Sequence, residues 1–397
     1  MTDGPATDAL AERLRAATLA CDRRLDRRPL SPAETFDALA AACRELGIEE
    51  WDAYGERGPV ARLETEVAGL LGRDAAAFFP SGVMAQQVAL RIHADRAGTR
   101  RVAMPDLSHL LVHEEDGPRI LQDLQVEHLT RGRVPATREH LDAIPGRLAA
   151  VLVELPLRDA GCLLPTYDEL AGLSAACRER GIALHVDGAR IWESQPWFEK
   201  GLAELAALAD TVYVSFYKGL GGLAGAALVG DDDVIDEARL WRRRMGGTIF
   251  RTTPEAVAAL VGLRDRLPLM PDLVAWARAL AEALPASLVT QPAVPQTNTF
   301  LLYGAGDADT VNERLAGFME EHGVAISRPW SPSDEPGRIV TELAIGEEAL
   351  ELDPATVAAQ IAAIVEGSAP ESPGVVRQPE RAARRVEMTE QREGDPA

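Results

Sequence analysis

Short apolar runs that stop abruptly at polar residues dominate the pattern between residues 182 and 225. Ile182–Val186 and Thr211–Phe216 each have the length and the β-branched or aromatic content of a strand. The segment between them is rich in Ala, Leu and Glu, which favours a helix. A strand–helix–strand unit places both strands in one sheet, with functional groups at their C-terminal ends. The pattern therefore predicts an α/β fold with a mostly parallel sheet.

Other segments add elements to this unit. Ala61–Leu71 has apolar residues at helical spacing and is expected to be a core helix, and Ala149–Val153 is expected to be a buried strand. Ser31-Pro32-Ala33-Glu34 has the order of an N-cap, a first-turn proline and a capping glutamate. Apolar residues running into Pro80-Ser81-Gly82 predict a strand followed by the start of a helix.

The length of 397 residues suggests two domains with terminal extensions. We expect a helical arm over 1–50, a large domain over 51–260 and a smaller C-terminal α/β domain over 261–366. Residues 367–397 are Pro-, Glu-, Arg- and Ser-rich with few apolar positions, which is typical of a disordered tail.

Charge and cysteine usage narrow the function classes. The 41 basic and 62 acidic residues give a net charge of −21, which argues against a nucleic-acid or anionic-membrane partner. The four cysteines lack metal-binding spacing, so we expect reduced thiols, no metal and a cytoplasmic protein. The acidic N-terminus lacks the apolar core of a signal peptide, and no apolar run is long enough to span a bilayer.

Candidate chemistry comes from the two strand ends. Lys218 is one of only two lysines in the chain, and it follows the second strand beside glycines that let a ligand approach. A lysine amine can form an imine, which an always-protonated arginine cannot. Asp187 follows the first strand, and a carboxylate there can keep a pyridine nitrogen protonated.

The segment HVDGAR with a downstream KGLG resembles the threonine aldolase/β-eliminating lyase family of pyridoxal 5'-phosphate (PLP) enzymes. The likeness covers roughly Trp51 to Leu352. It implies the PLP-dependent transferase-like fold type I, a large mostly parallel-sheet domain plus a smaller C-terminal α/β domain. It also implies an amino-acid substrate and a homodimer or homotetramer.

By this resemblance, Lys218 carries the cofactor as a Schiff base and Asp187 pairs with its ring nitrogen. His109 stacks on the ring and can act as an acid or base. Ser81 and Gly82 hold the phosphate at a helix N-terminus. Arg190 contacts the cofactor's ring hydroxyl or the substrate carboxylate.

Three further residues are implied on the substrate side or at the subunit interface. Arg338, in GRIVT, would pair with the substrate α-carboxylate. Tyr54 is either an active-site residue reached from the partner subunit or a packed tyrosine of a Gly/Pro-rich loop. Arg251 would be a phosphate contact across the interface, displaced by one residue because Phe250 stands at the expected place.

The chain also departs from the family pattern. Leu157 replaces a histidine that lies beside the substrate β-hydroxyl in aldolases, and Val83 replaces a threonine. His113 stands where an apolar or aromatic residue is usual and is expected to be structural. Arg158 either contacts a substrate anion or is a solvated loop charge.

The favoured reaction is cleavage of a β-hydroxy-α-amino acid to glycine and an aldehyde. The first alternative is PLP-dependent β-elimination or other chemistry at Cα–Cβ of an amino acid. The second is a non-catalytic relative that binds an amino acid or PLP, against which Lys218, Asp187 and Arg338 argue together.

Overall fold

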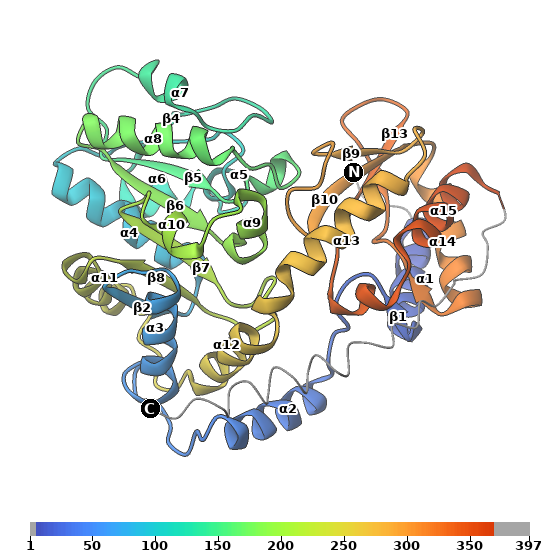
Figure 1. Ribbon diagram of the computed structural model, residues 1–397, viewed down its shortest axis with the longest axis horizontal. Helices are drawn as coiled ribbons and strands as arrows, with labels where there is room; N and C mark the ends of the chain where they lie inside the picture. Colours follow the sequence, from blue (N-terminus) through green and yellow to red (C-terminus); the bar gives the residue numbers. More distant parts are fainter. Residues whose placement is uncertain (1–4, 369–397) are drawn as a thin grey trace. The chain divides into compact units, whose positions relative to one another are not determined.

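The computed structural model describes residues 5–368, which form two compact units (Figure 1). Unit 2 comprises Pro29–Ala277 and Thr290–Leu302, and unit 1 comprises Met1–Arg28, Arg278–Val289 and Tyr303–Ala397. Among the described residues, those up to Arg28 fall in unit 1 with the C-terminal part of the chain, and the domain bounds expected from the sequence stay a prediction. The expected disordered tail, from residue 369 on, lies outside the described residues.

Unit 2 contains a seven-stranded sheet. β8 runs antiparallel to its neighbours β2 and β7, and the remaining neighbouring strands pair in parallel. The strand order is β2 (Ala75–Phe79), β8 (Ala226–Gly230), β7 (Thr211–Ser215), β6 (Ala183–Gly188), β5 (Ala150–Glu154), β3 (Arg101–Met104) and β4 (Gln125–His128). β6 and β7 are joined through α9 (Ile191–Phe198) and α10 (Leu202–Ala206), so the predicted strand–helix–strand unit is confirmed.

The helices of unit 2 begin where the sequence supplies caps. Ser31 and Glu34 form the expected capping box, with Glu34 accepting from the Ser31 amide at 2.8 Å. Ser81 is the N-cap of α4, and Asp231 that of α11. The helices are α2 (Pro32–Glu45), α3 (Gly58–Leu70), α4 (Gly82–Ala97), α5 (His109–Val112), α6 (Gly117–Gln122), α7 (Arg138–Asp142), α8 (Tyr167–Glu179), α11 (Asp232–Arg244) and α12 (Thr253–Asp265).

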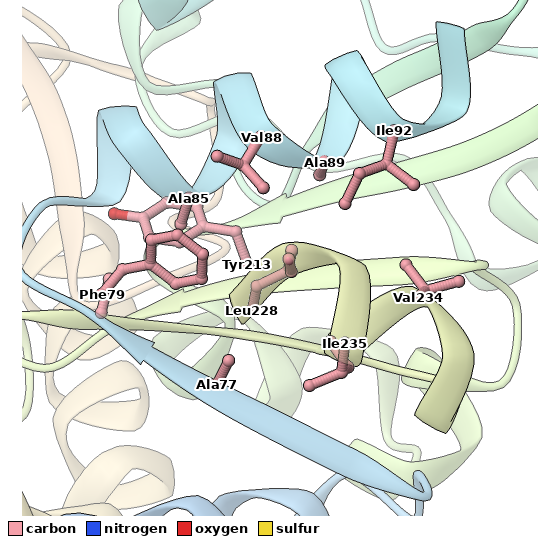
Figure 2. Packing of buried hydrophobic residues seen from close by; sticks show 12 residues of the cluster. Ala77, Phe79, Ala85, Val88, Ala89, Ile92, Tyr213, Leu228, Val234 and Ile235 are labelled. Carbon is pink, nitrogen blue, oxygen red and sulfur yellow. The ribbon is translucent and has the colours of Figure 1, made fainter. Parts of the chain in front are cut away.

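The packing of α4 fixes one end of the later site. Figure 2 shows Val88, Ala89 and Ile92 of α4 directed toward the sheet, with Ile235 of α11 in the same cluster. All of these side chains are fully buried. Burial of such side chains contributes about 1.5–3 kcal/mol for each large aliphatic one. The first turn of α4 is therefore held rigidly over the strands.

Unit 1 contains two smaller sheets and its own helices. The four-stranded sheet has the order β12 (Ser331–Pro332), β13 (Arg338–Ala344), β10 (Thr299–Ala305) and β9 (Val289–Gln291), and β1 (Arg23–Arg24) pairs with β11 (Val324–Ala325). The boundary between the units falls within α13 (Met270–Ala283), within β9 and within β10. The remaining helices are α1 (Pro5–Ala20), α14 (Ala308–His322) and α15 (Pro354–Glu366).

Helix α1 packs on α14, and Arg13 of α1 forms ion pairs with Glu313 and Glu320. This packing explains why the start of the chain belongs to unit 1. Among the described helices, none is long and apolar enough to cross a membrane.

Candidate active site

Acidic and basic side chains gather where neighbouring parallel strands of unit 2 end. β5 ends at Glu154, β6 carries Asp187 at its next-to-last position, and β7 is followed by Phe216-Tyr217-Lys218. Glu154 lies opposite Asp187 in the register of β5 and β6, and Asp187 lies opposite Tyr213 of β7. The sheet therefore brings together residues that are up to 64 positions apart (218 − 154), as expected of the C-terminal edge of a parallel sheet.

Asp187 is buried and held by fixed donors. Its Oδ1 accepts from the Ala189 amide at 2.9 Å, and the side chain of Gln86, the fifth residue of α4, also hydrogen-bonds it. Burial raises the pKa of Asp187, and the positive charge of Lys218 opposes that rise. A carboxylate in this setting binds a cation readily, because the charge would otherwise remain buried without compensation.

Lys218 is the cation that faces this carboxylate. Burial lowers the pKa of its ammonium group, while Asp187 raises it and Arg190 lowers it. A lowered pKa leaves more of the neutral amine, which is the form that attacks a carbonyl carbon. The structure thus brings Lys218 and Asp187 together, as the sequence predicted.

Glu154 is a second buried carboxyl group, and no role was assigned to it from the sequence. Burial and the neighbouring Asp187 raise the pKa of Glu154 to about 8. Its Oε1 accepts from Ser108 Oγ at 2.8 Å and from the His109 amide at 2.6 Å. Glu154 therefore fixes the start of α5, the helix that begins with His109.

Glu193 was also not predicted from the sequence to be a site residue. It lies on α9, three residues after Arg190, the N-cap of this helix. Its side chain is fully buried and accepts from Arg190 Nη1 at 3.3 Å. Burial raises the pKa of Glu193, and Arg190 and Lys218 counter this rise. A Cβ at residue 219 would clash with the Glu193 carboxylate, so Gly219 beside Lys218 is required for this packing.

The N-terminus of α4 lies at the same edge of the sheet. A Cβ at Gly82 would clash with the ring and hydroxyl of Tyr213, which Figure 2 shows beside Ala85 at this end of α4. Ser81 Oγ accepts from the Met84 amide at a long 3.5 Å. This weak cap leaves Ser81 and Gly82 suited to an anion at the helix N-terminus, and their contact with phosphate stays a prediction.

Two histidines of one segment meet at this edge. His109 Nε2 lies 2.9 Å from Glu114 Oε1, and burial together with Lys218 lowers the pKa of His109. The ring of His113 lies 4.8 Å from that of His109, measured between centroids. His113 Nε2 lies 2.7 Å from Asp159 Oδ2, which follows β5. The spacing of four residues between the histidines was the available sequence signal for this pair.

Tyr54 and Arg251 lie together in an exposed cluster of unit 2. The Tyr54 amide donates to the Phe250 carbonyl at 2.9 Å, and the two rings meet edge to face. The Arg251 guanidinium lies over the ring of Trp51 at 4.6 Å. Trp51, Tyr54 and Phe250 are all more than half exposed. We call Trp51, Tyr54, Phe250 and Arg251 the aromatic–arginine cluster.

Arg338 belongs to unit 1, at the start of β13. Its guanidinium lies 5.8 Å from the centroid of the Tyr303 ring and 3.3 Å from Glu335. Its role toward a substrate carboxylate stays a prediction. Leu157, at the position of the usual histidine, is buried, and its backbone pairs with Leu163 in both directions.

A mostly parallel sheet with a buried lysine–aspartate pair at its C-terminal edge defines an α/β enzyme of the PLP-dependent fold type I class. Residues 34–307 match the family model of the beta-eliminating lyases, so the chain belongs to the β-eliminating lyase family. The family and the fold class expected from the sequence are therefore confirmed, and the protein is a lyase.

Individual relatives agree with this assignment. A crystal structure of a candidate L-allo-threonine aldolase of Listeria monocytogenes is 35% identical, has a TM-score of 0.83, and the match covers 90% of this chain and 99% of that one. The low-specificity L-threonine aldolase 1 of Arabidopsis thaliana is 27% identical over 77% of this chain and 88% of its own. A low specificity L-threonine aldolase of Escherichia coli O157:H7 is 30% identical over 75% of this chain and 88% of its own.

Proposed function

We propose that this protein cleaves a β-hydroxy-α-amino acid to glycine and an aldehyde, with PLP as its cofactor. The observation that carries the proposal is the buried pair of Lys218 and Asp187 at adjacent strand ends. The names of the relatives, which are threonine aldolases, support the choice of substrate class.

The residues present fit this cofactor. Lys218 would hold it covalently, Asp187 would face its ring nitrogen, and His109 would cover its face. The N-terminus of α4 at Ser81 and Gly82 would bind its phosphate, and residue 82 must be a glycine because a Cβ there would clash with Tyr213. When bound, PLP withdraws electrons from the substrate Cα and so stabilises negative charge there.

The protein's own groups then orient the substrate and move protons. Asp187, ionised beside a cation, keeps the ring nitrogen protonated, and Glu193 holds Arg190 through the 3.3 Å contact. We assign Arg190 to the ring hydroxyl or the substrate carboxylate and Arg338 to the α-carboxylate. The β-hydroxyl group must lose a proton as Cα–Cβ breaks, which requires a base nearby.

We further propose that the protein is a homodimer or homotetramer in which the aromatic–arginine cluster meets a second copy. Three aromatic side chains more than half exposed in one cluster support an interface, because aromatic residues and arginine are enriched in interface cores. In this proposal Tyr54 and Arg251 reach the partner's site. The four free cysteines support a cytoplasmic location.

A product screen on the purified, cofactor-loaded protein tests the reaction. Threonine, allo-threonine, phenylserine and β-substituted alanines are supplied separately, and glycine, aldehyde and pyruvate are quantified. We expect glycine and aldehyde in equal amounts from at least one β-hydroxy amino acid. Pyruvate without glycine would replace the proposal with β-elimination, and the absence of all three products would reject catalysis on these substrates.

A further inference from the structure

The base for the β-hydroxyl proton is the open question at this site. Glu154 and Asp187 are buried beside one another, and Glu193 is fully buried against Arg190. Leu157 carries no titratable group. Two imidazoles are candidates: His109, on which Lys218 acts, and His113, whose ring contacts that of His109.

The two imidazoles have different surroundings. His109 is half-buried, Lys218 acts on it, and its Nε2 is engaged by Glu114. His113 is the more exposed, with 40% of its side chain accessible, and its ring lies 4.8 Å from that of His109, measured between centroids. A group that must meet an incoming substrate needs such access.

Asp159 sets the tautomer of His113. The carboxylate only accepts hydrogen bonds, so the 2.7 Å contact places a proton on Nε2 and leaves the lone pair on Nδ1. Among the described residues, Nδ1 of His113 has no hydrogen-bond partner. The arrangement thus resembles a carboxylate-oriented imidazole, in which the carboxylate also stabilises the imidazolium that forms.

The loop that carries Asp159 is itself rigid. Leu157 and Leu163 exchange two backbone hydrogen bonds, at 2.9 and 3.1 Å, and so close the loop around the short helix Arg158–Ala160. Arg158 lies 3.3 Å from the other carboxylate oxygen of Asp159. Asp159 is therefore placed by the backbone before any ligand binds.

We propose that His113 is the catalytic base that takes the β-hydroxyl proton and that Asp159 is its positioning residue. This inference rests on the proposed aldol cleavage. The O–H bond breaks, its proton bonds to Nδ1, and its electron pair forms the C=O bond of the aldehyde. The electron pair of the Cα–Cβ bond remains on Cα, which takes up one proton to give glycine. One proton is lost from the hydroxyl group and one is gained at Cα, so the overall reaction neither releases nor consumes a proton.

The charged groups around His113 are His109 and Glu114 on its own segment and Asp159 and Arg158 on the facing loop, with Lys218 beyond His109. Asp159→Asn removes the facing carboxylate and with it the acceptor that orients the His113 ring.

The main test compares His113→Asn with His128→Gln, a change at an exposed histidine of β4. Cleavage of threonine and phenylserine is measured beside the exchange of the glycine α-proton in D₂O, which needs no base at a β-oxygen. We expect His113→Asn to lower kcat for cleavage by about 10²–10⁴-fold, with KM and glycine exchange nearly unchanged. His128→Gln should change neither rate.

A structural role would lower exchange and cleavage together, and that result, or unchanged cleavage, would overturn the assignment of His113. If the unaltered protein exchanges the glycine proton but cleaves neither substrate, the proposed function fails instead. Ring ¹⁵N NMR of the cofactor-free protein gives a readout without turnover. The His113 signal should show the Nε2–H tautomer and change in Asp159→Asn, and an Nδ1–H tautomer would contradict the proposal.

Discussion

The two lysines of the chain lie in different surroundings, although both are in unit 2. Lys218 is largely buried beside Asp187, whereas Lys200 lies 3.7 Å from Glu204 and 5.2 Å from the centroid of the Tyr167 ring. Lys218→Ala should abolish the visible absorbance of bound PLP and all turnover, because Lys218 is the one lysine beside Asp187 in the described part of the chain. Absorbance spectra and product assays of the purified variant measure both effects.

Lys200→Ala is the matched control, since it removes the other lysine amine of the chain. It should keep the absorbance and at least half of the activity. A borohydride-reducible PLP linkage that persists in Lys218→Ala and disappears in Lys200→Ala would reverse the assignment.

At the scale of elements, the N-terminal half of β7 is tied to α4 and β6 by a buried network. Thr211 Oγ1 lies 2.9 Å from His93 Nε2 and 2.9 Å from His185 Nδ1. Burial lowers the pKa of His93 to about 4 and that of His185 to about 3. Asp210 raises the pKa of His93, and Arg96 lowers it further. Both rings are therefore neutral in the folded protein at neutral pH.

This network predicts acid sensitivity of the fold. Below about pH 6.5 the unfolded chain binds protons at these histidines and the folded protein does not, so stability falls as pH decreases toward 4. Between pH 6.5 and 5 each histidine should cost about 2 kcal/mol of unfolding free energy, at 1.36 kcal/mol per pH unit. Urea unfolding at several pH values measures this slope.

His185→Gln should flatten the slope over this range, at the cost of lower stability at pH 7.5 from altered packing. His128→Gln changes an exposed histidine of β4 and should leave the slope as it is. Equal slopes in the unaltered protein and in His185→Gln would show that other groups govern acid unfolding.

Elements whose pattern is local were predictable from the sequence. The apolar runs of β5, β6 and β7, the capping box at Ser31 and the start of α4 at Ser81 are confirmed. The packing of α1 on α14 was not, because it depends on contacts between segments about 300 residues apart. The same holds for the site: Lys218 and Asp187 follow strand ends, but the contact of His113 with Asp159 requires the folded register.

At the scale of the whole molecule, the aromatic–arginine cluster predicts self-association. Phe250→Asp places a charge in the centre of this cluster and should shift the protein toward monomers, because an unpaired charge in an interface core is costly. Sedimentation velocity measures the change in mass. Ile120→Asp, at an exposed apolar residue of α6, is the control and should keep the oligomer.

A monomeric unaltered protein with full activity would rule out the proposed contribution of Tyr54 and Arg251 to a partner's site. Loss of activity in Phe250→Asp together with loss of the oligomer would support it. Activity should return when the Phe250→Asp variant is mixed with the inactive Lys218→Ala variant. In a mixed oligomer, the first subunit supplies an intact Lys218 and the second supplies an intact aromatic–arginine cluster.

The small number of lysines relative to arginines also affects how the protein can react with its own aldehyde product. An enzyme that releases an aldehyde is exposed to its own product, which condenses with amines. Arginine supplies 39 of the 41 basic side chains (41 − 2 lysines), and its guanidinium stays protonated and does not condense in this way. Outside the site, Lys200 is the one lysine of the sequence that could form such an adduct, so the scarcity of lysine limits the number of places where the product can modify a side-chain amine.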